Sequence, residues 1–341
     1  MNTPLHTTAG ASDASPGAGG RIDIDADAVS APLREQHPDL AELTLRRVEG
    51  GWGHRMWRLG EEYVIRMPRD QYTPVSLLKE LRWLPELAPR LPLPVPVPRR
   101  GGVPGAGYPY RWAVLSWVSG EPADHAPIAV EHGPRSAEVL ADFLLALHRP
   151  APADAPEAAP RGGPLAPITP DFERRVAEFE ERLHELAPGI RADELRVVWE
   201  DAVAAPVWAG PPVWLHADLH PANVVVVDGV LGGVVDFDAL GIGEPAGDLA
   251  AAWLLLPTGA DRPCLERWLA AQPADERDAA EATIRRARGW AVLRSLILLG
   301  IGRAGLYGLP GGKPAWGPAG RAALQRVLAH FRQHGSTGSA R

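Results

Sequence analysis

Three polar residues in the second half of the chain have the types and the spacing for chemistry on phosphate groups. Asp218 is followed five positions later by Asn223, and Asp236 lies thirteen positions beyond Asn223. Between them Asp228-Gly229 joins two apolar runs, a strong hairpin signal that would place Asp236 beside Asn223. Phosphoryl transfer needs one carboxylate near the attacking hydroxyl and hard oxygen ligands for Mg²⁺ on the phosphates. The pattern therefore leaves Asp218 free to face an acceptor, with an amide and a carboxylate oxygen ready for the metal.

This segment has the catalytic-loop spacing of the protein-kinase superfamily and resembles, more closely, the signature of the aminoglycoside phosphotransferases. The matching stretches are His216-Ala217-Asp218-Leu219-His220-Pro221-Ala222-Asn223, Val235-Asp236-Phe237-Asp238, and Gly247-Asp248-Leu249-Ala250. The resemblance extends from about Val48 to Ala329. It implies a two-lobed α+β fold of the protein-kinase type, with ATP or GTP as co-substrate and a hydroxylated, antibiotic-like small molecule as acceptor.

The same resemblance assigns roles to individual residues. Asp218 would be the catalytic Asp, and Asn223 and Asp236 would be the Mg²⁺ ligands. His216 would hold the backbone of the loop by a hydrogen bond, and Asp248 would support the loop from behind.

The sequence departs from the family pattern at the phosphate-binding lysine. That lysine is expected on the strand Tyr63-Val64-Ile65-Arg66, which contains none, and Lys79 belongs to the following helix. Arg66 is therefore the predicted replacement, with Glu80 as its ion-pair partner, although a planar fork is not equivalent to a point charge. Arg66 followed by a hydrophobic residue and a proline also resembles the macrolide-kinase branch. A milder departure is Ala217, where Gly is common.

The nucleotide is expected between two lobes. Gly50, Gly51 and Gly53 would let backbone N–H groups approach the phosphates. The base would pair with the backbone around Ser116, Trp117 and Val118, so these side chains do not distinguish ATP from GTP.

The elements that must position these residues follow from the patterning. Residues 21–118 are predicted to form the nucleotide-binding lobe: a hairpin over 56–66, a helix over 76–87, a Pro-rich extended run over 89–98 and a strand over 111–118. Residues 119–334 are predicted to be mainly helical, apart from a Pro/Ala-rich loop at about 150–170 and the hairpin at 224–235. The segments 1–20 and 335–341 are polar or small in composition and are predicted to be disordered tails.

Composition excludes several other classes of protein. The net charge of −7 over 341 residues argues against nucleic-acid binding. The single cysteine, Cys264, cannot form an internal disulfide and fits a reducing, cytoplasmic location. The most apolar run, Trp290 to Ile301, contains Arg294 and predicts a buried helix that is too short to span a membrane. A monomer or a homodimer is expected.

Two hypotheses from other classes remain open at this point. His216, Asp218 and His220 form a His-x-Asp-x-His pattern that also occurs in metal-dependent hydrolases. The missing strand lysine suggests a catalytically inactive, kinase-like binding module, although the intact Asp218, Asn223 and Asp236 argue against it. The identity of the acceptor cannot be read from the sequence.

Overall fold

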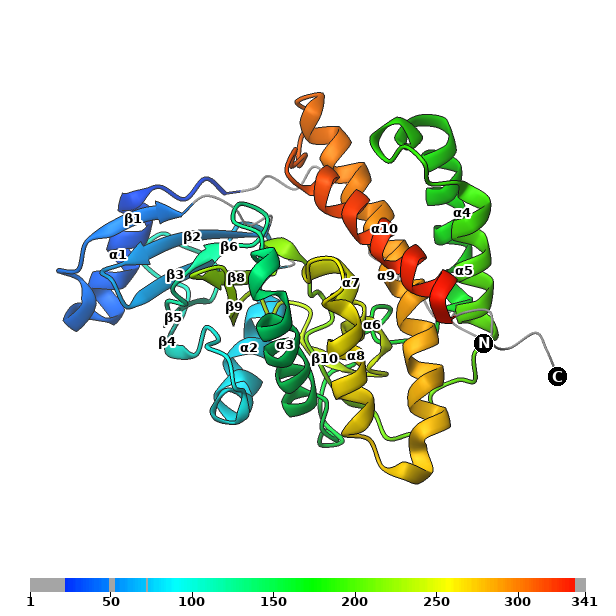
Figure 1. The fold of residues 1–341 in the computed structure, drawn as a ribbon. Coiled ribbons are helices and arrows are strands. Elements are labelled where there is room, and N and C mark those ends of the chain that lie inside the picture. Colours follow the sequence, from blue (N-terminus) through cyan, green and yellow to red (C-terminus); the bar gives the residue numbers. More distant parts are fainter. Residues whose placement is uncertain (1–21, 49–52, 72, 335–341) are drawn as a thin grey trace, which may run out of the picture.

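The structure is a computed structural model that describes residues 22–48, 53–71 and 73–334. The predicted tails at 1–20 and 335–341 lie outside this described part. One end of the molecule is a twisted antiparallel sheet, and the larger remainder is mainly helical (Figure 1). The predicted two-lobed α+β architecture is confirmed.

The first sheet has five antiparallel strands in the order β1-β2-β3-β5-β4. Their bounds are β1 Leu45–Val48, β2 His54–Leu59, β3 Tyr63–Pro68, β4 Pro98–Gly102 and β5 Trp112–Ser116. The predicted hairpin is β2–β3, whose register pairs Met56 with Arg66. This register places Arg66 on a central strand, between β2 and β5.

One helix covers each face of this sheet. α1 (Ala26–Gln36) packs Val29 and Leu33 against Trp57, Ile65 and other sheet residues. α2 (Pro74–Leu87) packs Leu77 against Val64 and Leu115 on the opposite face. α1 was not predicted from the sequence, although Asp25 caps it by accepting a hydrogen bond from the Ala28 N–H at 2.9 Å.

The helical lobe contains two small sheets that carry the predicted chemistry. β6 (Glu121–Pro122), β8 (Val224–Val227) and β9 (Val230–Val234) form one of them, and β7 (Val213–Leu215) pairs with β10 (Gly241–Gly243) in the other. The predicted Asp228-Gly229 turn joins β8 to β9, and both of its residues have positive φ, as this tight turn requires. The catalytic-loop segment therefore lies between two strand pairs.

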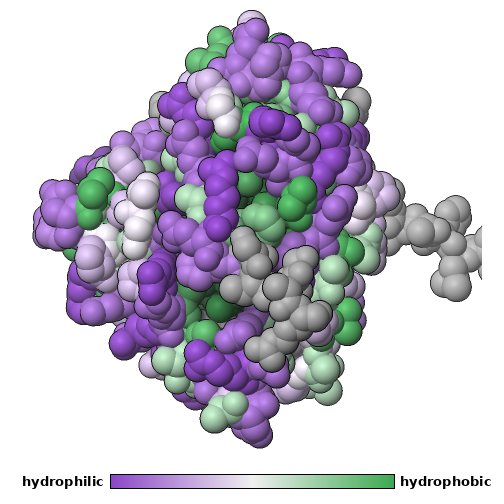
Figure 2. Space-filling model, turned by 45° about the vertical axis from the view of Figure 1, so that its right-hand side comes forward, coloured by the Kyte–Doolittle hydropathy of each residue, from purple (hydrophilic) through white to green (hydrophobic). Residues whose placement is uncertain are grey.

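Helices surround these sheets and form the main core. They are α3 Gly133–Leu147, α4 Thr169–Glu178, α5 Ala192–Ala204, α6 Ala246–Leu249, α7 Ala251–Leu255, α8 Asp261–Ala270, α9 Arg277–Leu306 and α10 Trp316–His334. α9 lies along α10 and also packs on α5 (Figure 1). The side of the molecule drawn in Figure 2 is mostly hydrophilic, with hydrophobic side chains exposed in small groups.

α9 is longer than the predicted segment 290–301. In the described part of the chain, the helical segment Ala274–Leu306 is long and apolar enough to cross a membrane by length and composition, but 61% of its apolar window is buried inside the protein. Arg294 does not interrupt it, because its guanidinium donates to the carbonyl oxygen of Ala217 at 2.8 Å. The burial is what the central helix of a folded lobe requires.

Candidate active site

The loop from His216 to Asn223 connects β7 to β8 and is held from behind by Asp248. The carboxylate of Asp248 accepts the backbone N–H of His216 at 2.7 Å and that of Ala217 at 2.8 Å. The ring of His216 contacts the carbonyl oxygen of Val235 through Nε2 at 3.0 Å. These contacts tie the loop both to α6 and to the segment between β9 and Asp236. Ala217 has φ 63°, a left-handed conformation that costs a non-glycine residue about 1 kcal/mol.

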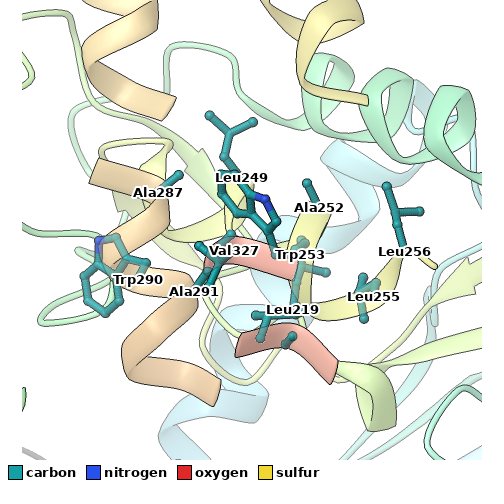
Figure 3. Packing of buried hydrophobic residues seen from close by; sticks show 14 of the residues in the cluster. Leu219, Leu249, Ala252, Trp253, Leu255, Leu256, Ala287, Trp290, Ala291 and Val327 are labelled. Atoms are coloured by element: carbon teal, nitrogen blue, oxygen red, sulfur yellow. The ribbon is translucent and has the colours of Figure 1, made fainter. Parts of the chain in front are cut away.

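Leu219 anchors the other side of the loop in the main core. Its side chain is fully buried and lies among Leu249, Trp253 and Ala291 (Figure 3). Because Asp218 directly precedes this anchor, its backbone position is fixed by hydrophobic packing as well as by hydrogen bonds.

The carboxylate of Asp218 forms an ion pair that the sequence analysis did not identify. Arg161 Nη1 lies 2.6 Å from Asp218 Oδ1, and the Asp218 side chain is 31% exposed. Burial alone would raise the pKa of Asp218, but the charges of Arg161, His220 and Arg294 together hold it well below its usual range. Asp218 is therefore ionised at neutral pH and can accept a hydrogen bond from a hydroxyl group.

Asn223 and Asp236 are brought together as predicted. The backbone N–H of Val235 donates to the carbonyl oxygen of Asn223 at 2.9 Å, which places Asp236 next to it. The Asn223 amide donates through Nδ2 to the carbonyl oxygen of Asp218 at 3.0 Å. Its Oδ1 accepts no hydrogen bond from any residue in the described part of the chain. The Asp236 carboxylate is 41% exposed, and its backbone has φ 62°.

Arg66 is buried among three carboxylates. Its Nη1 donates to both oxygens of Glu80 at 2.7 Å. Its Nη2 donates to Asp238 Oδ1 at 3.0 Å and to Asp236 Oδ1 at 3.1 Å. Burial alone would lower the pKa of Arg66, but these carboxylates raise it above its usual range, whereas burial raises the pKa of Glu80. One guanidinium thus faces three acidic groups.

This donor set fits a magnesium ion. Carboxylate oxygens of Glu80, Asp236 and Asp238 lie within 4.8 Å of one another, and Arg66 offsets only part of their charge. The free amide oxygen of Asn223 adds a neutral hard ligand beside Asp236. Asn223 and Asp236 could hold the ion, and Asp238 contributes further negative charge to the same place.

His54 is a second neighbour of this cluster that the sequence analysis did not identify. Its Nδ1 lies 3.1 Å from Arg66 Nη2 and 3.3 Å from Asp238 Oδ2. Burial lowers the pKa of His54, so the neutral ring fills the space beside Arg66 without adding charge.

The other predicted nucleotide-binding residues are placed less completely. Gly50 and Gly51 lie outside the described residues. Gly53 directly precedes β2, and its carbonyl oxygen accepts the backbone N–H of Arg69 at 2.9 Å. Nothing further in the structure assigns it to phosphate.

One of the three positions predicted to pair with the base has a backbone N–H without a partner in the described part of the chain. The N–H groups of Ser116 and Trp117 donate to the carbonyl oxygens of Val97 at 2.8 Å and Glu62 at 2.7 Å. The N–H of Val118 donates to no backbone carbonyl in the described part of the chain. Of the three predicted positions, Val118 is therefore the one whose N–H is available to a base.

The geometry does not support a histidine-ligated metal centre. His216 uses Nε2 on Val235 and accepts the Asp218 N–H through Nδ1 at 3.2 Å. His220 accepts the Ala222 N–H through Nδ1 at 3.3 Å. The group of possible metal ligands found among the described residues contains only carboxylates.

Comparison with known proteins agrees with this arrangement. The chain matches the APH phosphotransferase enzyme family over residues 44–289. No curated protein sequence matches it significantly.

Solved structures of such enzymes share the fold. The complex of APH(2")-IIia with GDP and kanamycin aligns with a TM-score of 0.58 at 19% identity, covering 89% of this chain and 98% of that one. Macrolide 2'-phosphotransferase MphH from Brachybacterium faecium aligns with a TM-score of 0.53 at 25% identity, covering 87% of this chain and 98% of that one. The chain therefore belongs to the APH phosphotransferase enzyme family and is a phosphotransferase with an alcohol group as acceptor.

Proposed function

We propose that this enzyme transfers the γ-phosphate of ATP or GTP, in the presence of Mg²⁺, to a hydroxyl group of an aminoglycoside, a macrolide or a related metabolite. The observation that carries the proposal is the single cluster formed by Asp218, Asn223 and Asp236, with the Arg66–Glu80 pair beside it. It combines an ionised carboxylate with hard oxygen ligands at the junction of the two lobes.

Asp218 acts on the acceptor. Its ionised carboxylate orients the acceptor hydroxyl and accepts the proton as the oxygen attacks phosphorus. Arg294 and Asp248 hold the backbone of the loop, so the carboxylate keeps its direction without needing to reorganise.

Asn223 and Asp236 hold the magnesium ion, which supplies electrostatic stabilisation of the phosphate oxygens when it is bound. Arg66 fixes Asp236 and Asp238 in place by hydrogen bonds and limits their mutual repulsion. Val118 N–H offers a donor to the base.

The antibiotic-like acceptor is supported by the compounds named for the structural neighbours. One neighbour is described in complex with kanamycin, and another is a macrolide phosphotransferase of 25% identity. Both classes of acceptor are cationic, and the net charge of −7 of this chain is compatible with a cationic partner.

The test is a nucleotide-consumption screen with Mg²⁺, with ATP and GTP in parallel, against aminoglycosides, macrolides and other hydroxylated metabolites. We expect consumption that depends on one acceptor class, and mass spectrometry should then locate one added phosphate on a hydroxyl. Phosphate release from simple esters without nucleotide would instead indicate the hydrolase hypothesis. Nucleotide binding without turnover on any acceptor would indicate the inactive binding module.

A further inference from the structure

Arg161 is the cationic residue whose side chain contacts the carboxylate of Asp218, the proposed proton acceptor. It lies in the loop between α3 and α4, and its Nη1 is 2.6 Å from Asp218 Oδ1. Its side chain is 47% exposed, whereas that of Arg66 is 6% exposed. Burial alone would lower the pKa of Arg161, but the charge of Asp218, with smaller contributions from Asp236 and Asp238, raises it above its usual range.

The backbone around Arg161 is built against β10 rather than left free. Ala158 N–H donates to the carbonyl oxygen of Ile242 at 2.9 Å, and Ile242 N–H donates to that of Pro156 at 2.8 Å. Beyond Arg161, the carbonyl oxygen of Gly162 accepts the Glu244 N–H at 2.9 Å. Two glycines permit this approach. A Cβ on Gly243 would lie 2.2 Å from the Gly162 carbonyl oxygen, and one on Gly247 would lie 2.6 Å from that of Arg161. The packing therefore holds the backbone of Arg161 close to the catalytic loop.

The other cations near Asp218 and Asp236 already have protein partners. Nη1 and Nη2 of Arg66 donate to Glu80, Asp236 and Asp238. Arg294 is buried and donates to the carbonyl oxygen of Ala217, and Lys79 donates to that of Leu240 at 3.1 Å. Arg161 is the cation of this group whose side chain is half exposed and whose partner is the proposed proton acceptor itself.

We propose that Arg161 leaves Asp218 when a nucleoside triphosphate binds and donates to the γ-phosphoryl group during transfer. The inference rests on the proposed function. In that reaction the acceptor oxygen forms a bond to the γ-phosphorus, and the bond from this phosphorus to the β–γ bridging oxygen breaks. The bridging oxygen keeps the electron pair, and the hydroxyl proton passes to Asp218. Moving Arg161 frees Asp218 Oδ1 for that proton and places a planar fork on the phosphoryl oxygens, which Arg binds well.

The test compares binding of triphosphates and diphosphates, so that it does not depend on turnover. Isothermal titration calorimetry of the full chain with Mg²⁺ would use non-hydrolysable analogues of ATP and GTP and the matching diphosphates. We expect Arg161→Gln to weaken binding of the triphosphate analogue by about tenfold to a hundredfold and binding of the diphosphate by less than about twofold. Arg161→Lys should recover part of the loss. The control is Arg149→Gln, which removes a positive charge from an exposed side chain at the start of the same loop. This variant should bind the triphosphate analogue and the diphosphate as the wild type does.

Three results would overturn the inference. Unchanged triphosphate binding in Arg161→Gln would show that the guanidinium does not reach the γ-phosphate. An equal loss of affinity for triphosphate and diphosphate in Arg161→Gln, seen also in the folded Arg161→Lys variant, would show that Arg161 maintains the structure of the whole site and makes no particular contact with the γ-phosphate. A wild-type protein that binds neither nucleotide would remove the proposed function together with the inference, whereas the first two results leave the proposed function intact.

Discussion

At the scale of single residues, the site is organised by two arginines that each neutralise acidic groups. Arg66 joins Glu80 of the sheet lobe to Asp236 and Asp238 of the helical lobe. Arg161 pairs with Asp218 on the acceptor side. A lysine in place of Arg66 could not bind Glu80 and the pair Asp236 and Asp238 at the same time, because its ammonium is a compact point charge and lacks the two separated NH₂ groups of a guanidinium.

Arg66→Lys is therefore expected to lose function although it restores the family's usual residue type. We expect the free energy of unfolding to fall by about 1–3 kcal/mol, since a buried carboxylate loses its partner. We also expect turnover to fall by about tenfold or more, because Asp236 loses its orientation. Chemical denaturation and steady-state kinetics measure the two effects. Arg58→Lys, on the neighbouring strand and paired with Glu61, is the control and should change neither. Equal behaviour of the two variants would contradict the bridging role.

The site residues that lie close together in the sequence could be predicted from their spacing, and two others that reach the site only through the fold were missed. Asp218, Asn223 and Asp236 are joined by one loop and one hairpin, so their spacing alone predicts that they meet. Arg161 contacts Asp218 and His54 contacts Asp238, each across a long stretch of chain. The position of Arg161 depends on how its loop packs on β10, which no local pattern encodes. His54 lies at the start of β2, before the predicted hairpin of residues 56–66, and reaches Asp238 only because the two lobes pack together.

At the scale of elements, the catalytic loop is held by its hydrophobic anchor. Leu219 is completely buried beside α6, α7 and α9 (Figure 3), and Asp218 is its immediate neighbour in the chain. A cavity at Leu219 would allow the loop to shift, and a shift of about 1 Å is enough to lower turnover strongly.

Leu219→Ala is expected to lower the free energy of unfolding by about 2–5 kcal/mol and also to lower turnover per folded molecule. Leu33→Ala is the matched control, because Leu33 is equally buried but lies on α1, in a separate hydrophobic cluster. It should lose similar stability and keep its turnover. Denaturation curves and kinetics at a temperature where both variants are folded make the comparison. Turnover that falls equally in both variants would show that the anchor has no special role.

The elements that could be predicted were those with strong local signals. The β2–β3 hairpin, α2 and the β8–β9 hairpin follow from alternation, helical spacing and the Asp-Gly turn. α1 was missed although it has a capping Asp, because its apolar face is short and has a proline, Pro32, inside the helix. The apolar run Trp290 to Ile301 marks only the middle of α9, because the parts of the helix on either side contain charged residues such as Arg286 and Arg303.

At the scale of the whole molecule, the two lobes meet at the site itself. Arg66 reaches across to Asp236 and Asp238, Lys79 donates to the Leu240 carbonyl, and Val234 N–H donates to the Pro94 carbonyl at 3.1 Å. Binding in this region therefore acts on the relative position of the lobes as well as on local contacts.

The stability of the helical lobe is expected to fall at mildly acidic pH because of His330. Burial, Arg288 and His334 lower the pKa of His330 to about 3, and its Nδ1 has no partner among the described residues. Because the folded pKa lies below the unfolded value near 6.5, the unfolded state takes up a proton first, so stability is lost as the pH falls below about 6.5.

His330→Phe should remove this dependence while keeping the edge contact with the Trp253 ring, whose centroid is 5.1 Å away. We expect the wild type to lose about 1 kcal/mol more than this variant between pH 7 and pH 5.5. Thermal or urea unfolding at both pH values measures it. His125→Phe changes an exposed ring and should keep the wild-type slope. A His330→Phe slope equal to that of the wild type would contradict the assignment.

The role of Asp218 as proton acceptor is tested most directly by the turnover of Asp218→Asn, measured as transfer of labelled γ-phosphate to the acceptor that the screen identifies. The substitution keeps the shape of the side chain and removes its negative charge. If Asp218 accepts the proton, turnover should be lower by about a hundredfold to ten-thousandfold, with nucleotide affinity changed by no more than about fivefold. Wild-type turnover in Asp218→Asn would contradict this role, because the proton would then leave the acceptor hydroxyl by another route.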